Sequence, residues 1–428
     1  MSGDSFRLCC TAKAMRLASL STIFIMLLIA AKTASGQELT AGSLDEAKAI
    51  EYALARPVIE QAEEARLLAA QSAVTESSLL PNPVVSITHD NAGAPGGHGS
   101  ESTIMLSQTV DISGRRKLRQ EAAQGRFLAS QLDGDARRTT IVQDVRRVFA
   151  EALYQKQLQE AHTAWLQHIE AAVEVVTQLA KAGEASGYDR RRLQREAQSA
   201  QARLDAIEAE GSRKREILAG LIAKRLPALT VLEGDLIPGS PPPLETLLAS
   251  TSATPVIASL EARANAFEHD RQAAARLGVP DITMGLGTKH VTEPGFSDNG
   301  LMLALSLPIP IFDQGQAQEQ EALAQAAALR AEHSLKLARL QAELRGLWQQ
   351  TTQLRETALS YREEALSTSH ELSHIAEAAY RAGEGSLLEL LDAYRAELDA
   401  QQMKLDLALQ ARLSRIELDS LTGASQYE

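Results

Sequence analysis

Apolar residues recur at helical spacing through two long stretches rich in Ala, Leu, Gln, Glu and Arg. Val145 and Phe149 belong to the first stretch, and Leu344 and Trp348 to the second. No proline lies between positions 96 and 226 or after 310, and the helical pattern of each stretch is broken once, near 183–187 and near 383–385. We therefore predict long helices over 115–181, 188–225, 314–381 and 387–421. At ~1.5 Å per residue, the first and third would each extend roughly 100 Å.

Shorter segments before each long helix alternate between apolar and small or polar residues. In the second of them, Leu303, Leu305 and Leu307 alternate with Ala304 and Ser306, and a glycine-containing loop precedes them. This pattern predicts strand hairpins at 82–112 and 281–310, each with one apolar face. Such strands suit a lipid-facing barrel in an exported protein, and the alternative is a pair of hairpins packed on helices of a soluble domain. Four strands cannot close a barrel, so the membrane interpretation requires several copies, and three would supply twelve strands.

The two halves of the chain are similar to each other. Pro81 corresponds to Pro280 and Ser107 to Ser306 at an offset of 199, and Gly183 corresponds to Gly383 at 200. A constant offset over a hundred residues indicates an internal repeat. We divide the chain into a first repeat at 37–225 and a second at 256–428, each being a helix, a hairpin and two long helices. The Pro/Ser/Thr-rich segment 226–255 joins them, and its sequence predicts neither helix nor strand.

The N-terminal residues resemble a secretory signal. An apolar run of 12 residues at 20–31 follows Lys13 and Arg16, which predicts a signal peptide at 1–36, with translation starting at Met1 or Met15. Cys9 and Cys10 fall within it, so the mature chain would contain no cysteine. No later window holds 18 consecutive apolar residues, and a helical membrane span is not expected.

Composition narrows the possible functions. Hydrophobic residues make up 44% of the chain but aromatic residues only 4%, which favours long helices over a bulky enzyme core. The net charge of -12 argues against nucleic-acid binding. There is no glycine-rich phosphate loop and no cysteine cluster, so we expect no cofactor and no nucleotide.

Several motifs together resemble the TolC-like outer-membrane factor family of tripartite efflux systems. They are Leu-Pro-Asn-Pro at 80–83, Leu-Pro-Ile-Pro-Ile-Phe-Asp at 307–313, and Tyr-Arg-Ala-Gly at 380–383 followed by Leu-Asp-Ala at 391–393. The segment Ser-Gln-Thr-Val-Asp-Ile-Ser-Gly-Arg-Arg at 107–116, without a lipid-attachment cysteine, is most similar to the cobalt/zinc/cadmium branch.

The resemblance implies an α+β membrane protein in the outer membrane that extends into the periplasm. Its form would be a homotrimer, with a twelve-stranded β-barrel of four strands per chain continuing into a long α-helical barrel. Its partners would be outer-membrane lipid, a periplasmic adaptor (membrane fusion) protein and an inner-membrane resistance-nodulation-division pump. Its function would be a passive exit duct for heavy-metal cations, not an enzyme.

The resemblance also suggests the gate. Glu389 and Asp392 match the acidic constriction of the family, where symmetry copies would form rings that attract cations. Without the resemblance, they are a solvated helix face. Tyr380 and Asp189 match positions that help hold the tip closed.

The helix-tip turns, where the adaptor would make contact, contain Gly183, Gly187, Gly383 and Gly385. Gly183 and Gly383 suit a tight reversal that needs positive φ. Gly385 departs from the family, in which the best-known type of member carries an arginine of the closing network here, so a looser closed state is expected.

One motif suggests other chemistry. His370-Glu371-Leu372-Ser373-His374 fits the zinc metalloprotease pattern H-E-x-x-H, but no third ligand is specified and the equivalent positions in the first repeat lack it. Occasional divalent-ion binding by His370 and His374 is the weaker version of this hypothesis. A further alternative is a periplasmic coiled-coil adaptor without a barrel, which would leave the two hairpins unexplained.

Overall fold

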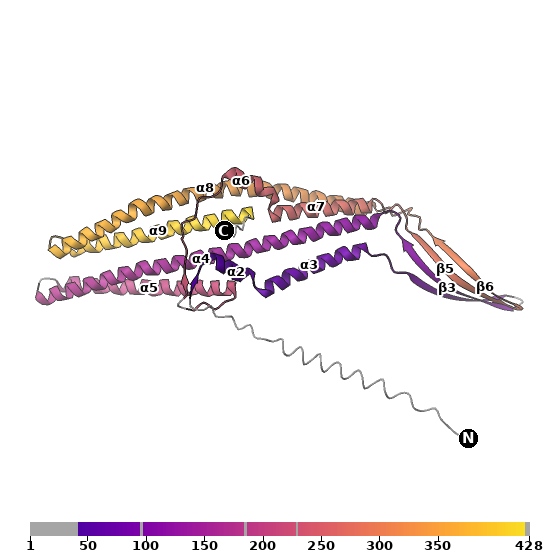
Figure 1. The fold of residues 1–428 in the computed structure, drawn as a ribbon, viewed down its shortest axis with the longest axis horizontal. Coiled ribbons are helices and arrows are strands. Elements are labelled where there is room, and N and C mark those ends of the chain that lie inside the picture. Colours follow the sequence, from indigo (N-terminus) through magenta and orange to yellow (C-terminus); the bar gives the residue numbers. More distant parts are fainter. Residues whose placement is uncertain (1–41, 95–96, 184–185, 228–229, 424–428) are drawn as a thin grey trace, which may run out of the picture.

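The computed structural model describes residues 42–94, 97–183, 186–227 and 230–423. The molecule is elongated, with long helices over most of its length and a narrow sheet at one end (Figure 1). The predicted signal peptide, with Cys9, Cys10 and Met15, lies outside the described residues.

Four long helices form two hairpins. In the first half, α4 (Arg115–Ala182) is followed by α5 (Gly187–Ile222), and in the second half α8 (Gln316–Ala382) is followed by α9 (Leu387–Thr422). They occupy the two proline-free stretches, because nothing there removes a backbone N–H from the helical ladder. The expected end of α5 at 225 is three residues too late, since Ala223 adopts a left-handed φ of 50°. No helix in the described ranges is long and apolar enough to cross a membrane.

Shorter helices fill the flanks of these hairpins. Helix α2 (Glu46–Leu54) and helix α3 (Pro57–Ser78) pack on α4, and α7 (Pro255–Ala274) packs against both α4 and α8. Proline begins α3 and α7, where its missing N–H costs no hydrogen bond. Helix α7 presents small side chains to its neighbours, so the helices approach closely; its buried alanines are Ala262, Ala264, Ala266, Ala273 and Ala274.

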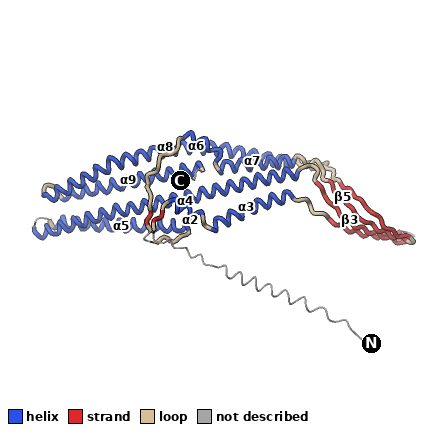
Figure 2. The backbone as a smooth tube through the Cα atoms, in the orientation of Figure 1, coloured by secondary structure: helices blue, strands red, loops and turns tan. Residues whose placement is uncertain are grey.

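The sheet joins the two halves. Its strands are β2 (Val84–Ala94), β3 (Gly97–Val110), β5 (Ile282–Glu293) and β6 (Phe296–Ser306), all antiparallel and in the order β2-β3-β5-β6. Strands β3 and β5, from different halves, pair in the centre, and Figure 2 shows the four together beyond the helices. The outer edges of β2 and β6 have no strand partner among the described residues.

The two faces of this sheet differ. One row across all four strands consists of apolar residues that are more than half exposed: Val85, Leu106, Leu286 and Leu303. Four residues further towards the hairpin turns, the same face becomes polar, with His89, Ser102, His290 and Asn299 in register. The apolar band therefore ends at a defined row. On the opposite face Gly287 has no space for a side chain, because a Cβ would collide with the Ile104 carbonyl and with Met105.

The connection between the halves is more ordered than its sequence predicts. Residues Leu244–Ser250 form helix α6, followed by a 3₁₀ turn, and strand β4 (Val231–Leu232) pairs in parallel with β1 (Ser43–Leu44). The expectation of neither helix nor strand over 226–255 was therefore wrong. Leu44 and Leu232 are buried in the core cluster that contains Phe149. Burial of Leu44 and Leu232 against distant core residues orders a segment in which no strand pattern continues for more than a few residues.

Candidate pore tip and equatorial network

Four glycines shape the helix tips for different reasons. Gly183 and Gly383 end α4 and α8 with φ of 81° and 75°, a conformation that L-residues avoid. A Cβ at either would meet nothing within 4 Å, as at Gly187 in the first turn of α5, so the demand at Gly183 and Gly383 is conformational. Gly385 is different, because a Cβ there would lie 3.2 Å from the Ala379 Cβ. The space beside the end of α8 is filled.

Glu389 is held by the cap of its own helix. The Ser386 backbone N–H donates to Glu389 Oε2 at 2.7 Å, and the Glu389 N–H donates to Ser386 Oγ at 3.3 Å. This reciprocal pair is a capping box. Hydrogen bonds from the backbone N–H and the hydroxyl of Ser386 lower the pKa of Glu389. Glu389 thus has a local structural role, and Asp392 lies exposed almost one turn further along α9.

The tip of the other hairpin resembles this one but is not identical. Ser186 caps α5 by accepting the Asp189 N–H at 3.1 Å, and its hydroxyl donates to Asp189 Oδ2 at 2.6 Å. Tyr380, near the end of α8, is half-buried; burial raises the pKa of its hydroxyl, and the negative charge of Asp189 raises it further. Tyr380 and Asp189 belong to different hairpins, and they are close enough for the charge of Asp189 to affect the Tyr380 hydroxyl.

An apolar cluster holds the two tips together within one chain. It combines Trp165 and Ile169 of α4 with Leu193 of α5 and Tyr394 of α9, and Tyr380 packs against it. The Trp165 and Tyr394 rings meet edge to face, with centroids 6.5 Å apart.

An ion pair that sequence reasoning missed also bridges the hairpins. Arg395 Nη2 of α9 lies 2.7 Å from Glu196 Oε2 of α5. The repeat offset is 200 in this region, so the two residues are not equivalent positions of the two halves; the counterpart of Arg395 is Arg195. No local pattern in the sequence indicates this ion pair, because it depends on how the two hairpins face each other.

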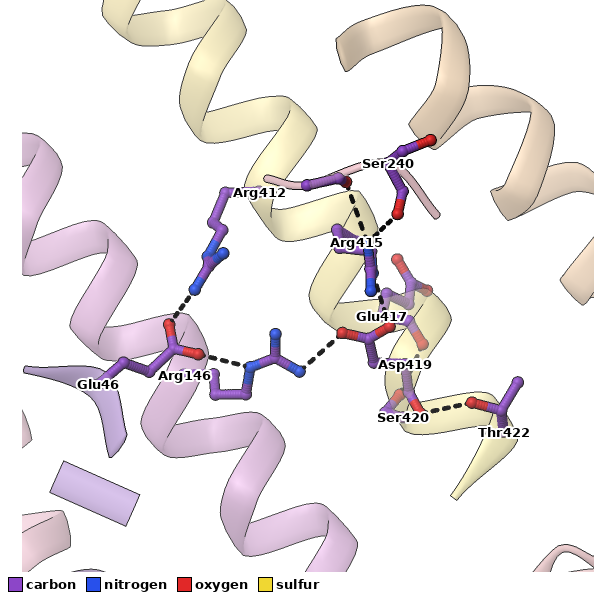
Figure 3. A network of polar contacts seen from close by, with 10 residues as sticks. Glu46, Arg146, Ser240, Arg412, Arg415, Glu417, Asp419, Ser420 and Thr422 are labelled. Carbon is purple, nitrogen blue, oxygen red and sulfur yellow. Dashed lines mark hydrogen bonds and ion pairs between the residues drawn. The ribbon is translucent and has the colours of Figure 1, made fainter. Parts of the chain in front are cut away.

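A second set of ion pairs, which the sequence did not predict, connects α2, α4 and α9, and we call it the equatorial network (Figure 3). Arg146 of α4 reaches Glu46 at 2.8 Å and Asp419 of α9 at 2.9 Å. Arg412 binds Glu46, and Arg415 binds Asp419 and donates to the Gly239 and Ser240 carbonyls. Burial alone would lower the pKa of Arg146, but the charges of Glu46 and Asp419 outweigh it and raise the pKa. The network ties α2, α4, α9 and the connection at one level.

The H-E-x-x-H segment lies on α8, well before the tip. His370 is exposed and its Nδ1 is 2.9 Å from Glu397 Oε1, while the rings of His370 and His374 have centroids 4.6 Å apart. In the part of the chain that the structure describes, no three or more histidine, cysteine or carboxylate side chains gather closely enough to hold a metal ion. The arrangement does not provide a protease-type zinc centre.

Comparison with known proteins decides the family. The outer membrane efflux protein family model matches residues 51–221 and 250–424, most of the chain. The chain belongs to this family. It is 24% identical to the cobalt-zinc-cadmium resistance protein CzcC of Cupriavidus metallidurans over 363 residues, which cover 82% of this chain and 84% of the relative.

Solved structures share the fold of this family member. CusC matches with a TM-score of 0.71 and 18% identity, covering 91% of this chain and 97% of the other. The open state of the Neisseria gonorrhoeae MtrE outer membrane channel matches with a TM-score of 0.70 and 19% identity, covering 88% of each chain.

Family membership confirms the main sequence prediction, an outer-membrane efflux channel that extends into the periplasm. The adaptor alternative was wrong, because the family is one of outer-membrane efflux proteins. The metalloprotease alternative gains no support, since the family comprises efflux ducts.

Proposed function

We propose that three copies of the chain assemble into a twelve-stranded outer-membrane barrel that continues into a helical tunnel across the periplasm. The open sheet carries this proposal. Four strands leave β2 and β6 unpaired at their edges, and an unpaired edge in lipid leaves several kcal/mol of backbone hydrogen bonding unsatisfied. Joining β6 of one copy to β2 of the next satisfies both edges and places the apolar band on the outside.

Exposed apolar residues on α8 support the same assembly. Leu335 is 74% exposed and Ile375 58% exposed in the single chain. A neighbouring copy packed along α8 would cover these side chains, as expected of an obligate interface.

The assembled protein is a passive exit duct in a tripartite efflux system. We infer a periplasmic adaptor and an inner-membrane pump of the resistance-nodulation-division class as its partners, and the pump provides the energy. The turns at Gly183, Gly187, Gly383 and Gly385 lie at the end of the molecule opposite the sheet, where an adaptor would reach them (Figure 1). Heavy-metal cations are the proposed cargo, supported by the likeness to CzcC.

The gate is formed by the tips. Threefold symmetry would turn Glu389 and Asp392 into two acidic rings, which concentrate cations at a constriction. Tyr380 and Asp189 help keep the tips together, and the Arg395–Glu196 ion pair adds a bridge between the hairpins. That bridge lies on the helices behind the tip, so a lock exists even with glycine at 385.

Single-channel conductance in a planar bilayer tests duct and gate together. The variant Glu389→Gln/Asp392→Asn removes the charges but keeps the capping box, because glutamine also serves at that position. We expect cation selectivity and divalent block to weaken severalfold, while Glu245→Gln on α6 changes neither. Pores with unchanged selectivity would remove the gate assignment, and folded trimer without pores in both the resting and the Tyr380→Phe forms would contradict the duct.

Cargo is tested in cells. A strain lacking the protein should lose resistance to Zn²⁺, Co²⁺ or Cd²⁺ and regain it on complementation. Unchanged metal sensitivity together with sensitivity to organic compounds would contradict metal cargo and leave the duct in place.

A further inference from the structure

The histidine pair on α8 has a supporting carboxylate. His370 and His374 are one helical turn apart, and their rings meet nearly perpendicularly at 4.6 Å. Glu397 of α9 places Oε1 2.9 Å from His370 Nδ1. The Glu397 side chain is only 10% exposed, whereas that of His370 is 64% exposed. A buried acceptor therefore stands behind an exposed imidazole.

This contact fixes which nitrogen of His370 is available. A carboxylate accepts a hydrogen bond from Nδ1–H, so the neutral ring carries its hydrogen on Nδ1 and its lone pair on Nε2. Metal-binding histidines are held in this way, with a carboxylate on the second ring nitrogen that orients the ring and increases its basicity. Glu397 thus gives His370 the tautomer and orientation of a ligand, and His374 supplies a second imidazole one turn away.

The space beside His370 is open enough for water molecules. A groove of about 790 Å³ lies between α4, α8, α9 and the connection, and His370 and Glu397 line it together with Glu160, Asp235 and Lys404. The described part of the chain brings no third histidine, cysteine or carboxylate into a metal-binding cluster. Water would therefore complete the coordination sphere, as expected for weak and exchangeable binding.

We propose that His370 and His374, positioned by Glu397, bind a divalent first-row transition ion such as Zn²⁺. Imidazole suits Zn²⁺, Co²⁺, Ni²⁺ and Cu²⁺ but not the hard cations Mg²⁺ and Ca²⁺. The inference goes beyond the duct function and holds whichever cargo the duct carries. Its test measures binding, so its failure is distinguishable from failure of the efflux proposal.

Calorimetric titration of the full-length protein in detergent with Zn²⁺ tests the site, in the presence of excess Mg²⁺ to occupy non-specific acidic positions. We expect one Zn²⁺ site per chain that His374→Ala removes. Glu397→Gln should weaken it about 10-fold, because loss of a supporting carboxylate typically costs that much. His333→Ala, on the same helix about ten turns away, is the matched control and should bind as the wild type does.

Two results would overturn the proposal. One is identical Zn²⁺ stoichiometry and affinity in wild type and the double variant His370→Ala/His374→Ala. The other is that excess Mg²⁺ abolishes Zn²⁺ binding that the wild type shows without Mg²⁺, which would indicate an oxygen site. Both histidines are exposed, so the double variant should keep its fold, and its helical circular dichroism and oligomer size confirm this before titration.

Discussion

Helices α4 and α8 have nearly the same length and equivalent places in the two halves, but their surroundings differ. Helix α4 packs against α2, α3, α5, α7 and α9, whereas α8 packs mainly against α7, α9 and the short α6. Phe149 on α4 is 2% exposed, and its counterpart Trp348 is half-buried and donates from Nε1 to the Pro242 carbonyl at 2.9 Å. Similar helices therefore have different surroundings: α4 forms the core of the chain, and α8 leaves a face exposed, which in our proposal neighbouring copies cover.

The two turns that lead from the sheet into α4 and into α8, which we call the first and second elbow, also differ in their surroundings. Asp111 accepts the Ser113 and Arg116 N–H groups, each at 2.8 Å, before α4, and Asp313 accepts the Gly315 N–H at 2.9 Å before α8. Both elbows contain a glycine with positive φ just before the helix. Only Gly315 is also enclosed. Corresponding turns in the two halves thus share a backbone conformation, while the surroundings of each turn determine how much a substitution costs.

The largest expected effect is at these elbow glycines. In Gly315→Ala a Cβ would collide with the Ala274 carbonyl and the Leu277 side chain, in addition to the left-handed conformation, so we expect a loss of about 4 kcal/mol. Gly114→Ala meets only the flexible end of Arg276 and should lose about 1 kcal/mol. Urea unfolding of both variants in detergent measures this. Equal losses would mean that crowding at Gly315 has no energetic consequence.

The second-largest expected effect is a difference in stability loss between Arg146→Ala and the same substitution at its counterpart, Arg345. Arg146→Ala removes the centre of the equatorial network, but Glu46 and Asp419 each keep another arginine, so the loss should be near the low end for buried pairs, about 3 kcal/mol. Arg345 is exposed, and Arg345→Ala should change stability by less than about 0.5 kcal/mol. Thermal unfolding of the two variants side by side provides the comparison, and similar melting temperatures would contradict a special role for the network.

The smallest effect is a pH dependence at the first elbow. Although burial of the Asp111 carboxyl pushes its pKa up, hydrogen bonds from Ser113 and Arg116 and the charge of Arg115 lower it from 3.8 to about 2. Because the folded pKa lies below the unfolded one, this stabilisation is present above pH 3.8 and is lost as pH falls through about 2. Asp111→Asn should therefore cost about 1 kcal/mol at pH 7.

That cost should shrink between pH 4 and pH 2, because the wild type loses the same charge there. Asp313→Asn, with a single backbone donor to lose, should cost less. Acid unfolding followed by circular dichroism distinguishes the two, and a cost for Asp111→Asn that is independent of pH would show that charge is not the cause.

The sequence predicted the elements that local rules determine. Absence of proline marked the long helices, alternation marked the strands, and Gly183 and Gly383 marked the helix ends, because each rule acts within a few residues. The family resemblance singled out Asp189 and Glu389, and these residues lie in the first turns of α5 and α9.

What the sequence did not predict depends on distant partners. The pairing of β1 with β4 joins segments almost 190 residues apart, and Arg146 finds partners 100 and 273 residues away. Nothing local distinguishes Arg146 from the exposed Arg345, or Glu196 from other helix-surface carboxylates. The capping role of Glu389 was readable from Ser386 three residues earlier, but the family resemblance drew attention to the pore instead.

The central claim is that β6 of one copy pairs with β2 of the next in a closed ring of three, and disulfide cross-linking tests it most directly. The only two cysteines, Cys9 and Cys10, lie in the predicted signal peptide, so Ser86→Cys on β2 can be combined with cysteine at Gly300, Met302 or Ala304 on β6. Within one chain these strands are three spacings, ~14 Å, apart, too far for a disulfide. The account predicts that at least one combination gives covalent dimers and trimers, ending at three chains and reversed by reductant. Products extending beyond three chains, or no product in any combination, would contradict it.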